Sequence, residues 1–284
     1  MSKISYNRSY SSLFFPGEAD DFFSFGPIMS DAALCAEMSR LAYVKDERRL
    51  KIYLERVDFT LVRTIGYNKP GMQVFVATAN HDVDPIAVAA FRGTELDDPT
   101  DLFADVRFWK VGWDGAGKVH DGFRDELARF SEVKDRGSLI PAGTRPLFTG
   151  HSLGAAFATL AAALHGPDYL YTFGSPRVGD KDFAASIQGL NHSRYVDCCD
   201  LVAKVPPTEL MGIEVGYEHV GVLHYIDRHG AVMLSPPDES IEDDQHEASW
   251  TYDKYAVVKG NVPARTLADH APINYVSAVM GLRA

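Results

Sequence analysis

A serine lies between two glycines where an apolar run gives way to an alanine-rich one. The run at residues 146–149 ends in "GHSLG" (150–154), and no helix breaker follows before Gly166. A tight turn from a buried strand into a helix presents a serine hydroxyl, and its glycines let neighbouring backbone come close. The pattern predicts that Ser152 is a nucleophile for acyl transfer. The free N–H of Leu153, at the start of that helix, is then a candidate oxyanion donor.

A nucleophilic serine needs a histidine that takes its proton, and the sequence offers ten. In folds with this turn the base follows the serine in the chain and stands in a loop. His270 meets that description, because it precedes a final helical stretch. The others precede the serine, lie in its turn or helix, fall in the run at 219–227, or sit in polar contexts expected to be solvated: His81, His120, His151, His165, His192, His219, His224, His229 and His246.

The histidine in turn needs a carboxylate, which should follow a strand that comes after the serine. "SRYVDCC" (193–199) is such a strand, and Asp200 is the first residue beyond it. Asp197 lies inside the strand, where alternation places it beside the wrong face. We therefore expect Asp200 to orient His270.

Elements of two kinds must hold these side chains. Strand-like runs are expected at 51–67, 72–79, 85–93, 146–150, 169–175, 193–199 and 219–227, of which the first two would be antiparallel edge strands. Helical segments are expected at 31–44, with Asp31 as N-cap, and at 121–133, 154–165 and 179–190. Buried strands alternating with helices predict an α/β fold with a mostly parallel central sheet and helices on both faces.

Several ordered motifs together resemble one family. "AFRGT" (90–94), "VHDGF" (119–123), "GHSLGAA" (150–156), "YTFGSPRVGD" (171–180), "YVDCCDLVAKVPP" (195–207), "EHVG" (218–221) and "DHAPINYV" (269–276) are similar to the class 3 lipases, α/β-hydrolases that resemble filamentous-fungal triacylglycerol lipases. The resemblance covers about residues 31–280. It implies that Ser152, Asp200 and His270 form the catalytic triad, and that the "HVG" histidine is structural.

Two further roles depend on the segment after the strand at 85–93. The family's matching residue makes Thr94 the second oxyanion donor. The resemblance also places a lid at about 95–117, where Leu102, Phe103, Val106 and Trp109 would form an apolar stripe that contacts substrate. This segment is more acidic than in the fungal lipases.

Composition limits the partners. The net charge of −11, without clustered Lys or Arg, excludes nucleic acid. No run is long enough to span a membrane, and the three cysteines have no zinc spacing. The first residues contain neither a continuous apolar run nor a small-residue cleavage site. We expect a cytoplasmic protein, or a secreted one if a leader has been removed.

These observations predict a 1–30 N-terminal extension followed by a single domain at 31–284. We expect a carboxylic ester hydrolase, a triacylglycerol lipase or esterase, that needs no cofactor or metal. Its partners would be lipid or other ester substrates and a lipid–water interface. A feruloyl-type esterase, a phospholipase A1 and an inactive lipid-binding relative are the alternatives.

Overall fold

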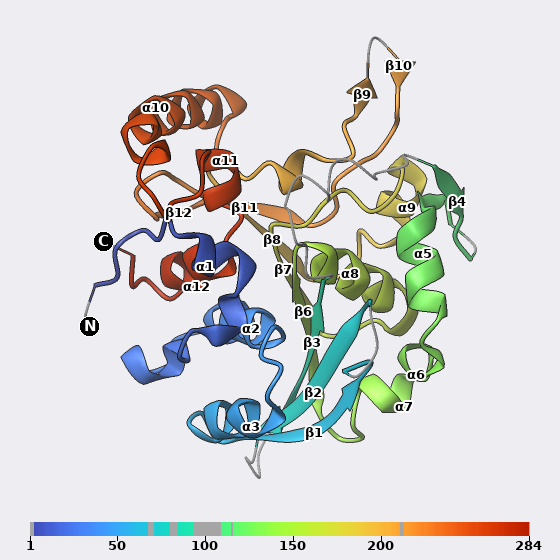
Figure 1. The fold of residues 1–284 in the computed structure, drawn as a ribbon. Helices are drawn as coiled ribbons and strands as arrows, with labels where there is room; N and C mark the ends of the chain where they lie inside the picture. Colours follow the sequence, from blue (N-terminus) through green and yellow to red (C-terminus); the bar gives the residue numbers. More distant parts are fainter. Residues whose placement is uncertain are drawn as a thin grey trace.

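A central sheet stands between two layers of helices in the computed structural model, which describes residues 3–67, 71–79, 85–93, 109–114, 116–210 and 213–283 (Figure 1). The sheet has eight strands, and β3, β6, β7, β8 and β11 run parallel. In spatial order they are β1 (Phe59–Ile65), β2 (Gln73–Ala79), β3 (Ile86–Arg92), β6 (Arg145–His151), β7 (Tyr169–Phe173), β8 (His192–Asp197), β11 (Val222–Ile226) and β12 (Val232–Leu234). β1, β2 and β12 are antiparallel to their neighbours. The expected mostly parallel sheet is confirmed.

Apolar side chains on both faces of the parallel strands explain the two layers, since each face must be covered. On one face lie α2 (Asp31–Leu41) and α12 (Pro272–Val279), with α1 (Tyr10–Phe14) and α3 (Glu47–Glu55) beside them. On the other lie α8 (Leu153–His165), α5 (Asp121–Ala128), α6 (Ser131–Lys134), α7 (Arg136–Leu139) and α9 (Lys181–Ser186).

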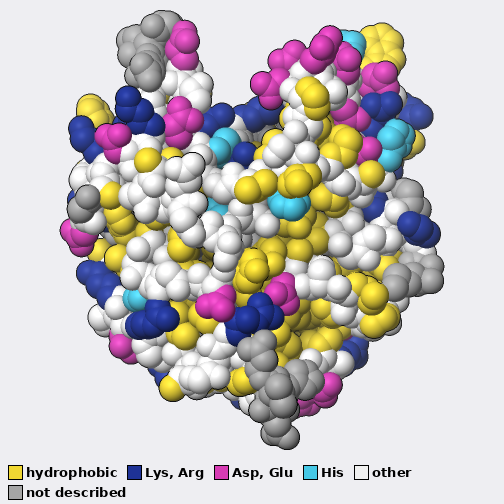
Figure 2. All heavy atoms as spheres, turned by 180° about the vertical axis from the view of Figure 1, so that it is seen from behind, with side chains coloured by type: hydrophobic (Ala, Val, Ile, Leu, Met, Phe, Trp, Pro, Cys, Tyr) yellow, Lys and Arg dark blue, Asp and Glu magenta, His cyan; other side chains and the backbone are white. Residues whose placement is uncertain are grey.

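The remaining strands and helices surround the end of the sheet where the parallel strands finish. They are β4 (Lys110–Gly112), β5 (Lys118–His120), β9 (Glu209–Leu210), β10 (Ile213–Glu214), α10 (Asp238–Ala256) and α11 (Arg265–Ala268). α10 and the β9–β10 hairpin project on either side of this end, and acidic side chains gather over α10 (Figure 2). The exposed acids of the first half of α10 are Asp238, Glu239, Glu242, Asp243 and Glu247.

Three local expectations were wrong. The run at 51–67 begins in a helix, because α3 extends to Glu55 and β1 begins only at Phe59. The N-cap of α2 is Ser30, whose hydroxyl accepts the Ala33 N–H at 3.1 Å, and Asp31 lies in the first turn. The strand expected at 193–199 ends at Asp197, so that Cys198 and Cys199 form a turn before Asp200.

The first residues pack against the last ones. Ile4 N–H donates to Leu282 O at 2.7 Å, and Asn7 N–H donates to the Asn274 side chain at 2.9 Å. Phe22 and Phe23 are buried in the same core as α2 and α12. Among the described helices, none is both long and apolar enough to cross a bilayer.

Candidate active site

Ser152 occupies the turn between β6 and α8 in a backbone conformation that few non-glycine residues adopt. Its φ is +59° and its ψ is −130°. The Ser152 N–H donates to Phe173 O on β7 at 3.0 Å, which ties the turn to the neighbouring strand. A non-glycine residue in this conformation is strained, which is typical of functional turns.

The two glycines of this turn are required by close backbone packing. A Cβ on Gly150 would lie 2.3 Å from Gly154 O, and a Cβ on Gly154 would lie 2.1 Å from Phe91 O on β3. Any larger residue would push the start of α8 away from the sheet. The spacing of "GHSLG" therefore follows from the approach of α8 to β3 and β6.

Ser152, His270 and Asp200 form a continuous hydrogen-bonded row. Ser152 Oγ lies 2.9 Å from His270 Nε2, and His270 Nδ1 lies 2.9 and 3.0 Å from the two Asp200 carboxylate oxygens. All three side chains are buried. An acceptor carboxylate places the proton on Nδ1, so Nε2 is free to accept the serine proton. The row can therefore generate a serine nucleophile.

Two hydrogen bonds hold the carboxylate of Asp200 in this row. Tyr275 Oη donates to one oxygen at 2.5 Å, and the Val202 N–H donates to the other at 2.8 Å. Tyr275 comes from α12, five residues after His270, so one helix positions the acid while the turn before it carries the base. Tyr275 lies in the motif "DHAPINYV" (269–276), but no pattern in the sequence predicts its role.

The start of α8 also offers a donor for a developing negative charge. Leu153 is the first residue of α8, and no described group accepts a hydrogen bond from its N–H. A Cβ on Gly93, at the end of β3, would lie 3.1 Å from Leu153 N. The chain that leads into Thr94 therefore passes directly over the helix start. Thr94 itself lies outside the described residues.

Asp197 and the rejected histidines have other partners. Arg283 Nη1 lies 2.9 Å from the Asp197 carboxylate, and both side chains are buried on the α12 side. His219 Nε2 donates to Ala203 O at 2.7 Å, and the His224 ring stacks on Tyr195. Neither histidine contacts Ser152 among the described contacts.

His192 and His246 correct the expectation of polar, loop-like surroundings. His192 is only 6% exposed on β8, where its Nε2 lies 2.8 Å from Thr172 Oγ1. Burial, with the nearby Arg194 charge, lowers the pKa of His192 to about 3. His246 is exposed but lies on α10.

Part of the expected lid falls outside the described residues, namely Leu102, Phe103 and Val106. Trp109 is described, and 70% of its surface is exposed. It leads into the β4–β5 hairpin, where Lys110 Nζ donates to Val215 O and Gly216 O at 2.8 Å. The described end of this segment is thus fixed to the body of the protein.

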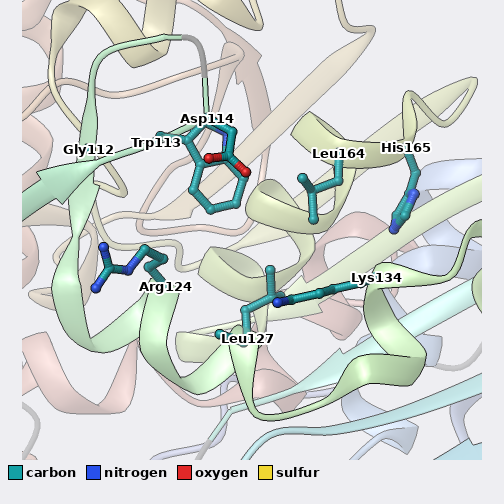
Figure 3. Close-up of a pocket in the computed structure, with 9 residues that line it drawn as sticks. Gly112, Trp113, Asp114, Arg124, Leu127, Lys134, Leu164 and His165 are labelled. Carbon is teal, nitrogen blue, oxygen red and sulfur yellow. The ribbon is translucent and has the colours of Figure 1, made fainter.

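A cavity of about 380 Å³ lies away from the row, at the carboxyl end of α8 (Figure 3). Leu127, Leu164 and Trp113 give it apolar walls, and Arg124 and Lys134 lie at its rim. Because Ser152 is at the opposite end of α8, this cavity does not hold the reacting ester.

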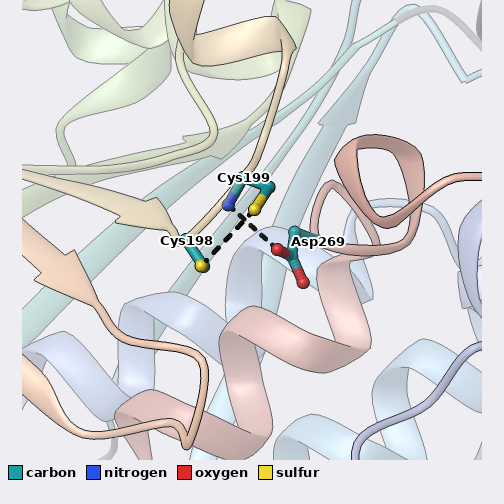
Figure 4. Close-up of side chains that lie close together, drawn as sticks. All are labelled: Cys198, Cys199 and Asp269. Atoms are coloured by element: carbon teal, nitrogen blue, oxygen red, sulfur yellow. Dashed lines mark hydrogen bonds between the residues drawn. The ribbon is translucent and has the colours of Figure 1, made fainter. Parts of the chain in front are cut away.

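Cys198, Cys199 and Asp269 form a buried cluster behind Asp200 with ligand atoms within 4.8 Å of one another (Figure 4). The Asp269 carboxylate already accepts hydrogen bonds from the Cys199 N–H, from Tyr6 Oη and from Arg265. The cluster therefore links the turn before Asp200 to the residue before His270. Its carboxylate is neutralised by a guanidinium, which makes it unsuited to a cation.

Comparisons with known proteins relate the chain to a family of lipases. Residues 88–210 match the family model described as "Lipase (class 3)". The secreted mono- and diacylglycerol lipase 1 of Fusarium solani is 31% identical over 196 residues, covering 61% of this chain and 53% of that protein. The lipase of Rhizomucor miehei is 31% identical over 159 residues, covering 50% and 43%. The chain thus spans about half the length of the curated relatives that it matches.

The fold itself is shared with a solved structure. The lipase from Rhizopus microsporus var. chinensis superposes with a TM-score of 0.55 at 24% identity, covering 84% of this chain and 82% of that one. At this identity the likeness shows a common fold.

Proposed function

We propose that this chain, which belongs to the class 3 lipase family through residues 88–210, hydrolyses carboxylic esters through an acyl-enzyme on Ser152. The observation that carries the proposal is the hydrogen-bonded row from Ser152 through His270 to Asp200. The row has the order of contacts that serine nucleophiles require, and it lies at the carboxyl ends of parallel strands.

The reaction proceeds in two halves. His270 Nε2 takes the proton from Ser152 Oγ as the oxygen attacks the ester carbonyl, and Asp200 stabilises the imidazolium that forms. The Leu153 N–H receives the developing oxyanion, with Thr94 as the second donor. The imidazolium then returns its proton to the leaving alcohol. Water, activated by the same histidine, cleaves the acyl-enzyme and regenerates Ser152.

Acylglycerols are the substrate class that we propose. The family and the names of the two relatives support it, since one is a mono- and diacylglycerol lipase and the other a lipase. Residues 95–117 are proposed to contribute the cover of the site, with exposed Trp109 at its described end. The enzyme would then bind its substrate at a lipid–water interface. This interface would lie in the cytoplasm, or outside the cell if the protein is secreted.

Replacing Ser152 with Ala tests the mechanism. We expect turnover of p-nitrophenyl butyrate to fall by about 10⁴–10⁶-fold, because triad residues act as a unit. Labelling by a fluorophosphonate should disappear, while thermal unfolding stays close to that of the original protein. Turnover retained by a clean Ser152→Ala preparation would exclude the acyl-enzyme, and an unlabelled original protein would favour an inactive lipid-binding relative.

Initial rates on a substrate panel separate the activities. The panel contains soluble and emulsified glycerol esters from C2 to C18, methyl ferulate and a phosphatidylcholine. The proposal expects the highest rates on emulsified acylglycerols. Highest rates on methyl ferulate or on phosphatidylcholine would instead identify a feruloyl-type esterase or a phospholipase A1.

A further inference from the structure

A second histidine lies directly against the proposed base. The rings of His151 and His270 are 4.6 Å apart at 37°, and His151 is buried in the last position of β6. His151 also meets the ring of Tyr275 edge-on at 5.6 Å. It therefore contacts both the base and the tyrosine that holds the acid.

The polar partners of His151 determine where its proton lies. Nε2 lies 2.8 Å from His270 O, a carbonyl that can only accept, so Nε2 carries the hydrogen. Nδ1 must then accept, and Tyr43 Oη, at 3.0 Å, is the donor. The hydroxyl of Tyr43, in the turn that follows α2, thus sets the tautomer of the histidine that is hydrogen-bonded to the main chain of the base.

The surroundings also keep His151 uncharged. Burial lowers the pKa of His151 well below its usual value, and the neighbouring His270 lowers it further. This matters during the reaction, since His270 becomes an imidazolium when it takes the serine proton. A neutral ring beside it does not oppose that charge, whereas a second imidazolium at this separation would.

We infer that His151 is a positioning residue, which holds His270 in register with Ser152 and Asp200 through its hydrogen bond to the His270 carbonyl. The inference rests on the proposed function and deepens it. The base stands in the short turn between α11 and α12, so any displacement of that turn carries its ring away from Ser152 and Asp200. An anchor on the carbonyl limits this motion, and errors of about 1 Å in such groups cost about 10²-fold in rate.

Packing alone is the competing explanation, and two substitutions separate it from positioning. His151→Phe keeps an aromatic ring against His270 and Tyr275 but removes both hydrogen bonds. His151→Gln loses the ring but restores an N–H donor that can reach His270 O. The matched control is His224→Phe, at a half-buried position in β11 where the original ring stacks on Tyr195 at 4.6 Å.

Kinetic constants of the full chain are measured with soluble p-nitrophenyl butyrate, per active site counted by fluorophosphonate labelling. We expect His151→Phe to lower kcat by about 10–100-fold with KM changed by less than about threefold. His151→Gln should regain most of that loss, and His224→Phe should match the original protein. A His151→Phe protein with unchanged kcat would show that the ring only packs.

A second readout does not depend on ester hydrolysis. The Nδ1 proton of His270, shared with Asp200, should give a downfield proton NMR signal that His270→Gln abolishes. We expect this signal to shift or exchange faster in His151→Phe and to recover in His151→Gln. If the original protein neither labels nor hydrolyses esters yet the signal responds in this way, the proposed function fails while the positioning stands. An unchanged signal overturns the positioning.

Should His151→Phe not fold, Tyr43→Phe replaces it. This change removes one oxygen and leaves His151 Nδ1 without the donor that sets the tautomer. The expected result is a fall in kcat of about 3–10-fold together with faster exchange of the His270 proton. If both kcat and the exchange rate of the His270 proton in Tyr43→Phe equal those of the original protein, the inference is wrong.

Discussion

Asp197 and Asp200 lie at the two ends of one turn, but their hydrogen-bond partners differ, and so do their roles. Asp200 accepts from His270, Tyr275 and the Val202 N–H on the side of the serine. Asp197 ends β8 and neutralises the buried guanidinium of Arg283 on the α12 side. One carboxylate can orient a base, and the other can only support the fold.

Exchanging each carboxylate for an amide tests this division. Asp200→Asn should lower kcat by about 10⁴-fold, because the amide favours the wrong tautomer of His270. Asp197→Asn should keep kcat per active site but lower the free energy of unfolding by about 3 kcal/mol, since Arg283 loses its buried partner. Steady-state kinetics and urea unfolding measure the two effects. An inactive, fully stable Asp197→Asn protein would transfer the catalytic role to Asp197.

Among the elements, those with a strong local signal were predictable. The apolar runs of β3, β6 and β7 and the alanine-rich α8 are confirmed. The apolar run that begins at Lys51 predicts a strand where α3 lies, but the buried residues of α3 are Leu50, Tyr53 and Leu54, at helical spacing. α10 was missed because its buried residues are Asp244, Ala248 and Tyr252, which form no apolar stripe.

The candidate site divides in the same way. The turn at Ser152 was predictable, because its glycine spacing is a local requirement of packing. The contacts of His151 with Tyr43 and His270 were not, since they join residues more than one hundred positions apart. The burial of His192 also depends on distant strands, because β8 lies between β7 and β11. The sequence around His192 does not indicate that central position.

The buried histidine of β8 should make stability depend on pH. Because the pKa of His192 is lowered to about 3, the folded state excludes a proton that the unfolded chain binds below about pH 6.5. The stability that neutral His192 allows is fully present above that pH. It is lost progressively as the pH falls toward 3. His192→Gln can still form a hydrogen bond to Thr172. Between about pH 7.5 and pH 5, its free energy of unfolding should therefore fall by about 2 kcal/mol less than that of the original protein.

Urea unfolding at the two pH values gives this difference directly. His246→Gln, at an exposed position on α10, is the matched control. Its free energy of unfolding should fall between the two pH values by as much as that of the original protein. An equal loss in His192→Gln would mean that His192 takes up its proton without disturbing the folded state.

At the scale of the whole molecule, the first and last segments of the chain meet beside the site. Tyr6 Oη donates to Asp269 at 2.6 Å, and the guanidiniums of Arg265 and Arg283 lie 4.7 and 4.6 Å from the Tyr6 ring centre. Asp269 directly precedes His270 and also binds the turn before Asp200. Residues that the sequence suggested as an extension thus support the two loops that carry the base and the acid.

Tyr6→Ala should therefore destabilise the protein from a position far from the serine in sequence. It removes a hydrogen bond to a buried carboxylate, worth about 1.5–3 kcal/mol, and three cation–π contacts, from Arg8, Arg265 and Arg283, of about 0.5–1 kcal/mol each. Because Arg265 still pairs with Asp269, part of this is recovered, and we expect a net loss of about 2 kcal/mol. At about 2–4 °C per kcal/mol, the melting temperature should fall by roughly 4–8 °C.

Tyr10→Ala is the matched control, because Tyr10 belongs to the same segment but is exposed, and its ring stacks only on Phe14 among the described aromatic contacts. Its melting temperature should change by less than about 2 °C. Differential scanning calorimetry compares the two variants, and kcat per active site reports on the loops. If Tyr6 supports those loops, kcat of Tyr6→Ala should fall earlier on heating than that of Tyr10→Ala, because the turns before Asp200 and His270 lose their shared anchor first. Identical melting and identical activity profiles would mean that the first residues cover the molecule without stabilising its site.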